Sequence, residues 1–155
     1  HRAAENGHAG VIRTFLETKT VDLNINVLDA HGDGGTPWLL AAKRGHINVL
    51  EVLLEASADS DAVELLNGTT ALQFASAEGK ESTVRWLLEK KLSKIDETDF
   101  LGNTALHYAS QKGQELVIDE LMRWGANPQK ENYEGKIPSE IAQKLSNDTT
   151  LNTLN

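Results

Sequence analysis

The 155-residue sequence contains no cysteine, few aromatic residues and fewer basic than acidic residues. Without cysteine it cannot form a disulfide scaffold, a thiolate zinc site or a cysteine nucleophile, and it suits a reducing compartment. A net charge of −8 leaves no basic footprint for nucleic acid or an anionic lipid surface. No apolar run reaches the roughly 18 residues that a membrane span needs. We therefore expect neither a nucleic acid nor a membrane partner, and an intracellular location, cytoplasmic with the nucleus as the alternative.

The dominant positive feature is an internal repeat. One column of residues recurs at steps of 34, 34 and 33 residues, at Thr36, Thr70, Thr104 and Ile137. A second column follows nine residues after each threonine, at Gly45, Gly79 and Gly113. Several columns that agree over successive steps are the sequence signature of a repeat architecture.

Each repeat predicts a helix, a turn and a second helix. Thr36 can cap a helix whose first residue is Pro37, because proline is tolerated at the first helical position. Gly45 can end that helix, because glycine accepts a positive φ. The stretch 47–54 then carries apolar residues at helical spacing. Helices this short are marginal alone, so neighbouring repeats must bury their apolar faces together in a solenoid.

The helix-start motif identifies a resemblance. It reads T-P-W-L-L-A at 36–41, T-A-L-Q-F-A at 70–75 and T-A-L-H-Y-A at 104–109. These stretches resemble the ankyrin repeat family, whose repeat of about 33 residues has a T-P-L-H-x-A core. The resemblance implies an all-α repeat solenoid whose helix-turn-helix units are joined by β-hairpin-like finger loops. It implies one domain over 1–155, with a truncated first repeat at about 1–32, full repeats at 33–66, 67–100 and 101–131, and a shortened capping repeat at 132–155.

The histidines are the first candidates for chemistry. His1 and His107 share a repeat column but lie three repeats apart, roughly 25–30 Å at the spacing of packed helices. They cannot share one metal ion, whose ligand bonds are about 2 Å long. The resemblance implies that His107 is a strut whose ring nitrogens bond the neighbouring threonine and a loop backbone, with catalysis or metal binding as the minor alternative. We predict no catalytic, metal-binding or cofactor-binding residue, and therefore no enzyme activity and no cofactor.

Repeat columns also place the tryptophans. Trp38 and Trp86 fall at columns expected to be buried, so both are predicted to lie in the core. Trp124 falls beside a helix end, where partial exposure is expected.

The resemblance implies a protein or peptide partner on the concave face, which fingertips and first helices form, and a monomeric chain. Leu66, Phe100 and Tyr133 share one fingertip column, with steps of 34 and 33 residues. This row has two readings of equal weight: a strip that binds a partner, or side chains that pack on one another and stiffen the fingers. The full predicted partner-binding set is Leu66, Phe100, Leu101, Tyr133, Asp33, Lys43, Arg44, Glu78, Asn103 and Lys112.

Two functions from different classes follow. The first is a non-enzymatic protein–protein interaction module or scaffold. The alternative is a targeting or substrate-recruiting domain of a larger enzyme or effector whose catalytic part lies outside this segment. Because the sequence starts within a repeat at His1, we expect more repeats or another domain to precede it.

Overall fold

The computed structural model describes residues 1–18, 24–29 and 35–143, and within them the chain forms nine α-helices and no β-strand. The inner layer consists of α1 (Arg2–Glu5), α3 (Pro37–Arg44), α5 (Ala71–Ala77), α7 (Ala105–Lys112) and α9 (Pro138–Gln143). The outer layer consists of α2 (Ala9–Glu17), α4 (Ile47–Glu55), α6 (Glu81–Glu89) and α8 (Glu115–Arg123). The predicted all-α repeat solenoid is confirmed.

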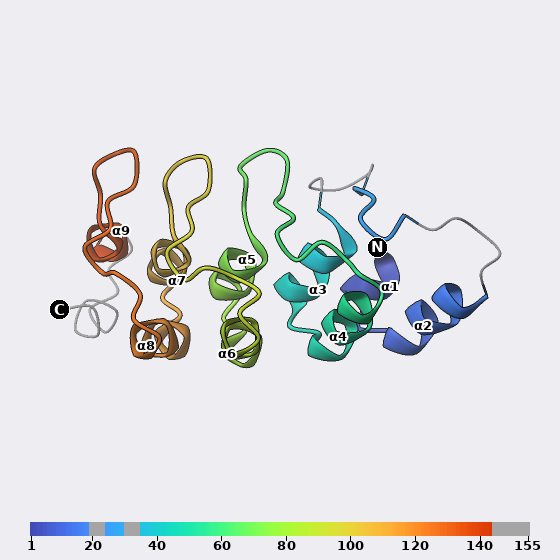
Figure 1. Cartoon of the computed structure of the whole chain (residues 1–155). Coiled ribbons are helices and arrows are strands. Elements are labelled where there is room, and N and C mark those ends of the chain that lie inside the picture. The colour runs from blue at the N-terminus through green and yellow to red at the C-terminus, as the bar shows by residue number, and fades with distance from the viewer. Residues whose placement is uncertain (19–23, 30–34, 144–155) are drawn as a thin grey trace.

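The helices stack in two parallel rows (Figure 1). Each inner helix contacts the next inner helix along the chain, and each is paired with the outer helix that follows it, up to α8. The loops that enter α5, α7 and α9 rise side by side above the inner row as three fingers (Figure 1). This arrangement makes one long face from fingers and inner helices, and an opposite face from the outer helices.

The predicted helix starts are confirmed. Thr36, Thr70 and Thr104 are extended N-cap residues whose hydroxyls accept a backbone N–H three residues later. Gly45 and Gly113 end α3 and α7 in the left-handed conformation, at φ 83° and 66°. The expectation that Gly79 ends the first helix of its repeat is wrong by one residue. Helix α5 ends at Ala77, so its C-cap is Glu78, and Gly79 follows at φ 67°.

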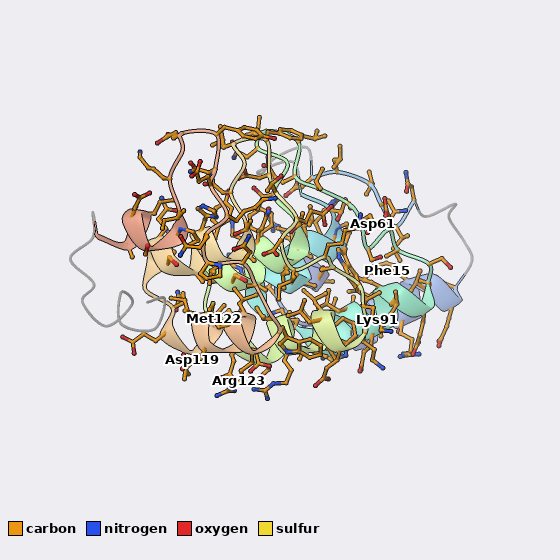
Figure 2. The ribbon with its side chains drawn as sticks, turned by 60° about the vertical axis from the view of Figure 1, so that its left-hand side comes forward. Phe15, Asp61, Lys91, Asp119, Met122 and Arg123 are labelled. Carbon is orange, nitrogen blue, oxygen red and sulfur yellow. The ribbon has the colours of Figure 1, made fainter. Side chains whose placement is uncertain are left out.

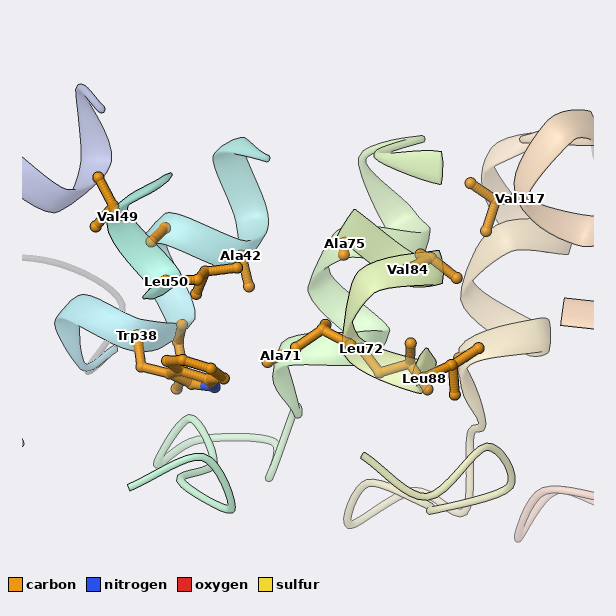
Figure 3. Close-up of a cluster of buried hydrophobic side chains, with 14 of the residues drawn as sticks. Trp38, Ala42, Val49, Leu50, Ala71, Leu72, Ala75, Val84, Leu88 and Val117 are labelled. Atoms are coloured by element: carbon orange, nitrogen blue, oxygen red, sulfur yellow. The ribbon is translucent and has the colours of Figure 1, made fainter. Parts of the chain in front are cut away.

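The core lies between the two rows and is built mainly from aliphatic and small side chains (Figure 3). Ala42 and Ala75 are fully buried, which lets neighbouring helices approach closely. Trp38 is buried as predicted, with its ring centroid 6.3 Å from that of Trp86. The prediction for Trp86 is wrong: its side chain is half-buried and packs against the edge of the core from α6. Trp124, after α8, is partly exposed as expected.

Candidate functional site

The fingers are folded around an acidic or amide side chain at the base of each tip. Glu64 accepts the backbone N–H groups of Leu66 and Asn67 at 2.7 and 2.9 Å. Asp99 does the same in the next finger for Leu101 and Asn103, at 2.9 and 2.8 Å. Asn132 accepts from Glu134 and Lys136 through its Oδ1 atom. Side chains of this kind replace backbone partners in tight turns, so the tips keep a fixed shape.

Backbone hydrogen bonds also join adjacent fingers. The Phe100 N–H donates to the Asn67 carbonyl at 2.8 Å, and the Tyr133 N–H donates to the Leu101 carbonyl at 3.0 Å. These bonds align the three fingers so that Leu66, Phe100 and Tyr133 occupy equivalent positions. In the first two fingers, the residue of the row directly precedes the residue whose carbonyl accepts the bond. The row that the repeat spacing predicts is therefore present in the backbone, although the fingers contain no β-strand within the described residues.

The tips expose large apolar side chains. Leu66 and Tyr133 are each 77% exposed, Leu65 and Phe100 60%, and Leu101 58%. We call these five residues the finger strip. Figure 2 shows side chains along the tops of the fingers, with Asp119 and Arg123 of α8 at the opposite edge of the molecule. Exposed apolar side chains that gather on one surface mark interaction sites more often than isolated ones do.

The aromatic rings of the strip rest on glycines of the preceding finger. A Cβ atom added to Gly68 would lie 2.5 Å from two ring atoms of Phe100. A Cβ added to Gly102 would lie 2.8 Å from Cδ1 of Tyr133. Each ring therefore lies against a glycine of the preceding finger and leaves much of its surface exposed. The two rings thus pack on glycines of the preceding finger and remain accessible to a partner.

A groove of about 350 Å³ lies beneath the tips, where the fingers meet the inner helices. Leu66, Lys43, Glu78 and Lys112 from the predicted set line it. Its floor includes Phe74, whose ring centroid lies 5.3 Å from the Lys43 ammonium, within the range of a cation–π contact. The groove thus brings together predicted residues from α3, α7 and the 64–69 finger, and it mixes charge with apolar surface.

The other predicted residues are placed differently. Arg44 donates to Glu5 of α1 at 2.6 Å, and this carboxylate raises the pKa of its guanidinium. Asn103 is half-buried and joins two fingers, because its Oδ1 accepts from the Asn132 side chain at 2.8 Å. The predicted site residue Asp33 lies outside the described residues.

Sequence reasoning missed three residues of this face. Leu65 is an additional residue of its finger. In each finger a backbone N–H at the base donates to a carbonyl on the other side of the tip, and this bond encloses six residues from Glu64 to Thr69 but five from Asp99 to Asn103. Phe74 and Tyr108 line the groove from α5 and α7. The Tyr108 hydroxyl donates to Asp99 at 2.6 Å, and burial together with this bond raises its pKa to about 12. The adjacent leucines at 65 and 66, next to an Asn-Gly turn, were the available signal for Leu65.

His107 is held as a strut, with the geometry that the resemblance implied. Its Nδ1 accepts the Thr104 backbone N–H at 3.1 Å, and its Nε2 lies 3.0 Å from the Lys136 carbonyl. Burial lowers the pKa of the imidazole, which favours the neutral form that accepts at one nitrogen and donates at the other. The ring thereby ties α7 to the 132–136 finger.

In the described ranges, no three or more His, Asp or Glu side chains gather in a way that could hold a metal ion. None of the helices in this part of the chain is long and apolar enough to cross a bilayer. A second cavity, of about 410 Å³, lies between α1, α2 and residues 24–27 and is lined mainly by apolar side chains. It contains no predicted site residue.

Comparisons with known proteins agree with the geometry. The family model for three copies of the ankyrin repeat matches residues 60–132, and the single-repeat model matches residues 33–64. A similar mouse protein, "Ankyrin repeat and SAM domain-containing protein 6", is 40% identical over 39% of this chain and 7% of its own length. The rice "Probable E3 ubiquitin-protein ligase XBOS33" is 34% identical over 57% of this chain and 16% of its own length. The human "Transient receptor potential cation channel subfamily A member 1" is 36% identical over 64% of this chain and 8% of its own length.

Proposed function

This chain belongs to the ankyrin repeat family, and we propose that it is a non-enzymatic module that binds a protein or peptide partner through its fingers and inner helices. Ankyrin repeats are in general protein–protein interaction modules. The binding surface consists of the finger strip and the groove beneath it. The chain would act as a scaffold that presents this surface, as a monomer inside the cell, in the cytoplasm or the nucleus.

The observation that carries the proposal is the finger strip itself. Five large apolar side chains are more than half exposed on three adjacent fingers. At such exposure they contribute little to the stability of the loops. Interfaces take most of their affinity from a few large apolar or aromatic side chains that become buried together. Phe100 and Tyr133 are suited to this role because their rings are already positioned on the glycines below, so little side-chain entropy is lost on binding.

Charged residues of the groove would supply selectivity. Lys43 and Lys112 flank the groove together with Glu78, so both signs of charge face a bound partner. Charges at the rim of an interface tune association and specificity more than affinity. Arg44 and Asn103 would contribute by holding α3 and the fingers in place through the contacts with Glu5 and Asn132.

The test compares two serine variants in binding to partners isolated with the unmodified chain. The first is Leu65→Ser/Leu66→Ser/Leu101→Ser, which removes three strip leucines and keeps the rings on their glycines. The matched control is Leu116→Ser, which removes an exposed leucine from α8, on the opposite face. We expect the strip variant to lose partner binding by about tenfold or more, and the control to keep it. An equal affinity for both variants, at unchanged melting temperature, would contradict the proposed surface.

A second function is favoured by the relatives. The chain spans 7 to 16% of the length of the three proteins compared above, and one of these is named a probable E3 ubiquitin-protein ligase. In this second function the domain recruits a substrate for a larger enzyme or effector. The complete gene product decides between the two functions: a catalytic domain beside these repeats would favour the second, and further repeats alone would favour the first.

A further inference from the structure

We propose that the partner segment that docks on the finger strip is an amphipathic α-helix that lies across the three fingers. This inference rests on the proposed function and specifies the conformation and the side-chain pattern of the partner. Three observations support it: the hydrogen bonding of the finger backbone, the distance between the apolar side chains of adjacent fingers and the scarcity of charge at the tips.

The backbone N–H groups of the tips already donate hydrogen bonds within the protein. Every N–H from Phe100 to Asn103 donates within the protein, to Asn67, to the Asp99 side chain or to the Asp99 carbonyl. Every N–H from Tyr133 to Lys136 likewise donates to Leu101 or Asn132. A partner in extended conformation would therefore find no free backbone N–H donor at these two tips with which to pair. A helix satisfies its own backbone and needs only side-chain contacts, which these tips offer.

The spacing of the anchors also matches a helix. Successive repeats stack at roughly 8–10 Å, so corresponding side chains on adjacent fingers recur at about that distance. Two turns of an α-helix, from residue i to residue i+7, advance about 10.5 Å. Apolar residues at i, i+7 and i+14 can thus meet the fingers that carry Leu66, Phe100 and Tyr133, and flanking positions at i+3 or i+4 can reach Leu65 and Leu101. Such a stripe needs about four turns of helix.

The strip offers little charge for recognition. The charged pair Lys136 and Glu134 at the last finger is engaged in a mutual ion pair. The Glu64 and Asp99 carboxylates are buried and accept backbone N–H groups. Binding at the strip should therefore be driven by burial of apolar surface. Its expected signatures are a negative heat-capacity change and a weak dependence on salt.

The experiment uses two display libraries of peptides about 18 residues long, selected against the purified chain. The helical library fixes apolar residues at i, i+3, i+7, i+10 and i+14 and randomises the polar positions. The extended library uses the same apolar residues with prolines that prevent a helix. The best binders from each library are then measured by calorimetry on the unmodified chain, the triple leucine-to-serine strip variant and Leu116→Ser.

We expect binders from the helical library only, with helicity that rises on binding. Their affinity should fall about tenfold or more on the strip variant and stay unchanged on Leu116→Ser. Extended binders that depend on the strip would overturn the helical partner and leave the proposed surface intact. Helical or extended binders that are indifferent to the strip variant would overturn the surface as well. Failure of both libraries to yield binders would count against both proposals.

Discussion

Two consecutive repeats, the α5–α6 and α7–α8 pairs, perform the same structural tasks with different residues. In α5, Gln73 accepts the Thr70 N–H and donates to two loop carbonyls, at residues 97 and 103. In α7, His107 accepts the Thr104 N–H, and its other nitrogen bonds the Lys136 carbonyl. The amide and the imidazole thus close the same capping box. What the repeat preserves is a hydrogen-bonding pattern, and only one of the two side chains makes that pattern sensitive to pH.

The repeats differ at two further places. The atoms that cover the finger glycine differ. The three atoms nearest to a Cβ added at Gly68 all belong to the Phe100 ring, whereas a Cβ added at Gly102 would meet the Tyr133 ring and also backbone atoms of Tyr133 and Asn132. The turn after the outer helix has Lys91 at φ 55° in the first repeat and Gly125 at φ 85° in the second. Each difference leads to a measurable consequence.

The largest expected effect is that of Gly102→Ala. The added Cβ would lie 2.8 Å from the Tyr133 nitrogen and 3.1 Å from the Asn132 Cα, and backbone atoms cannot move away cheaply. We expect a loss of about 1–2 kcal/mol from the left-handed φ and about 1–3 kcal/mol more from overpacking. Chemical denaturation measures the change. The control is Gly135→Ala, at the same finger position with open space around it, which should show the first loss alone.

Gly68→Ala sharpens the same comparison. The three atoms nearest to its added Cβ all belong to the Phe100 ring, and a side chain shifts at lower cost than backbone, so the loss of unfolding free energy should lie between those of the other two glycine variants. A loss at Gly68 that equals or exceeds the loss at Gly102 would show that the ring, and not the finger backbone, limits the packing.

Glu120→Gln breaks the ion pair that joins the two repeats. Glu120 is buried on α8 and accepts from Arg85 of α6 at 2.9 and 3.0 Å, and these bonds lower its pKa to about 2. We expect a loss of about 1–3 kcal/mol at neutral pH. Because the folded pKa lies below the unfolded value of 4.5, the difference between wild type and variant should be constant above that pH and shrink as the pH falls toward 2.

Denaturation curves between pH 7 and pH 2.5 test this prediction. The matched control is Glu89→Gln, on the exposed end of α6, which should change stability little. A difference between wild type and Glu120→Gln that does not shrink in acid would contradict the role of the charged pair.

Lys91→Gly should stabilise the protein. A lysine at φ 55° is strained by about 1–2 kcal/mol, and glycine removes the strain but adds freedom to the unfolded chain. The net expected gain is about 0.5–1 kcal/mol in unfolding free energy, visible as a higher melting temperature. Lys90→Gly, one residue earlier at φ −78°, should lower the melting temperature instead. Equal effects of both variants would rule out strain at Lys91.

The smallest effect at neutral pH is that of His107→Gln, which introduces the residue found at the equivalent position, 73, of α5. Above pH 6.5 the two proteins should differ by less than about 1 kcal/mol. Burial lowers the pKa of the folded imidazole, so below pH 6.5 the unfolded state binds more protons and wild type should lose stability relative to the variant. The reciprocal change, Gln73→His, should introduce the same acid sensitivity into α5. Parallel pH profiles for wild type and His107→Gln would refute this account.

Much of the fold could be predicted because its causes are local. Thr104 caps and Gly113 ends a helix through atoms within a few residues of each, so their spacing alone predicts α7. The half-buried position of Trp86 could not be read from its repeat column, because it depends on how closely its neighbours cover α6. The same holds for Asn103, whose side chain looks free in the sequence but joins two fingers.

The sequence by itself determined the repeat, the helix starts and the row formed by Leu66, Phe100 and Tyr133, because periodic spacing and capping residues act over short distances. Only the tertiary structure decided which side chains meet between repeats, namely the Arg85–Glu120 pair and the rings on the finger glycines, and showed that Leu65 belongs to the strip. These contacts join residues about one repeat apart, and small differences in each loop set them. That is why the surface proposed to bind a partner is visible in outline from the sequence and in detail only from the fold.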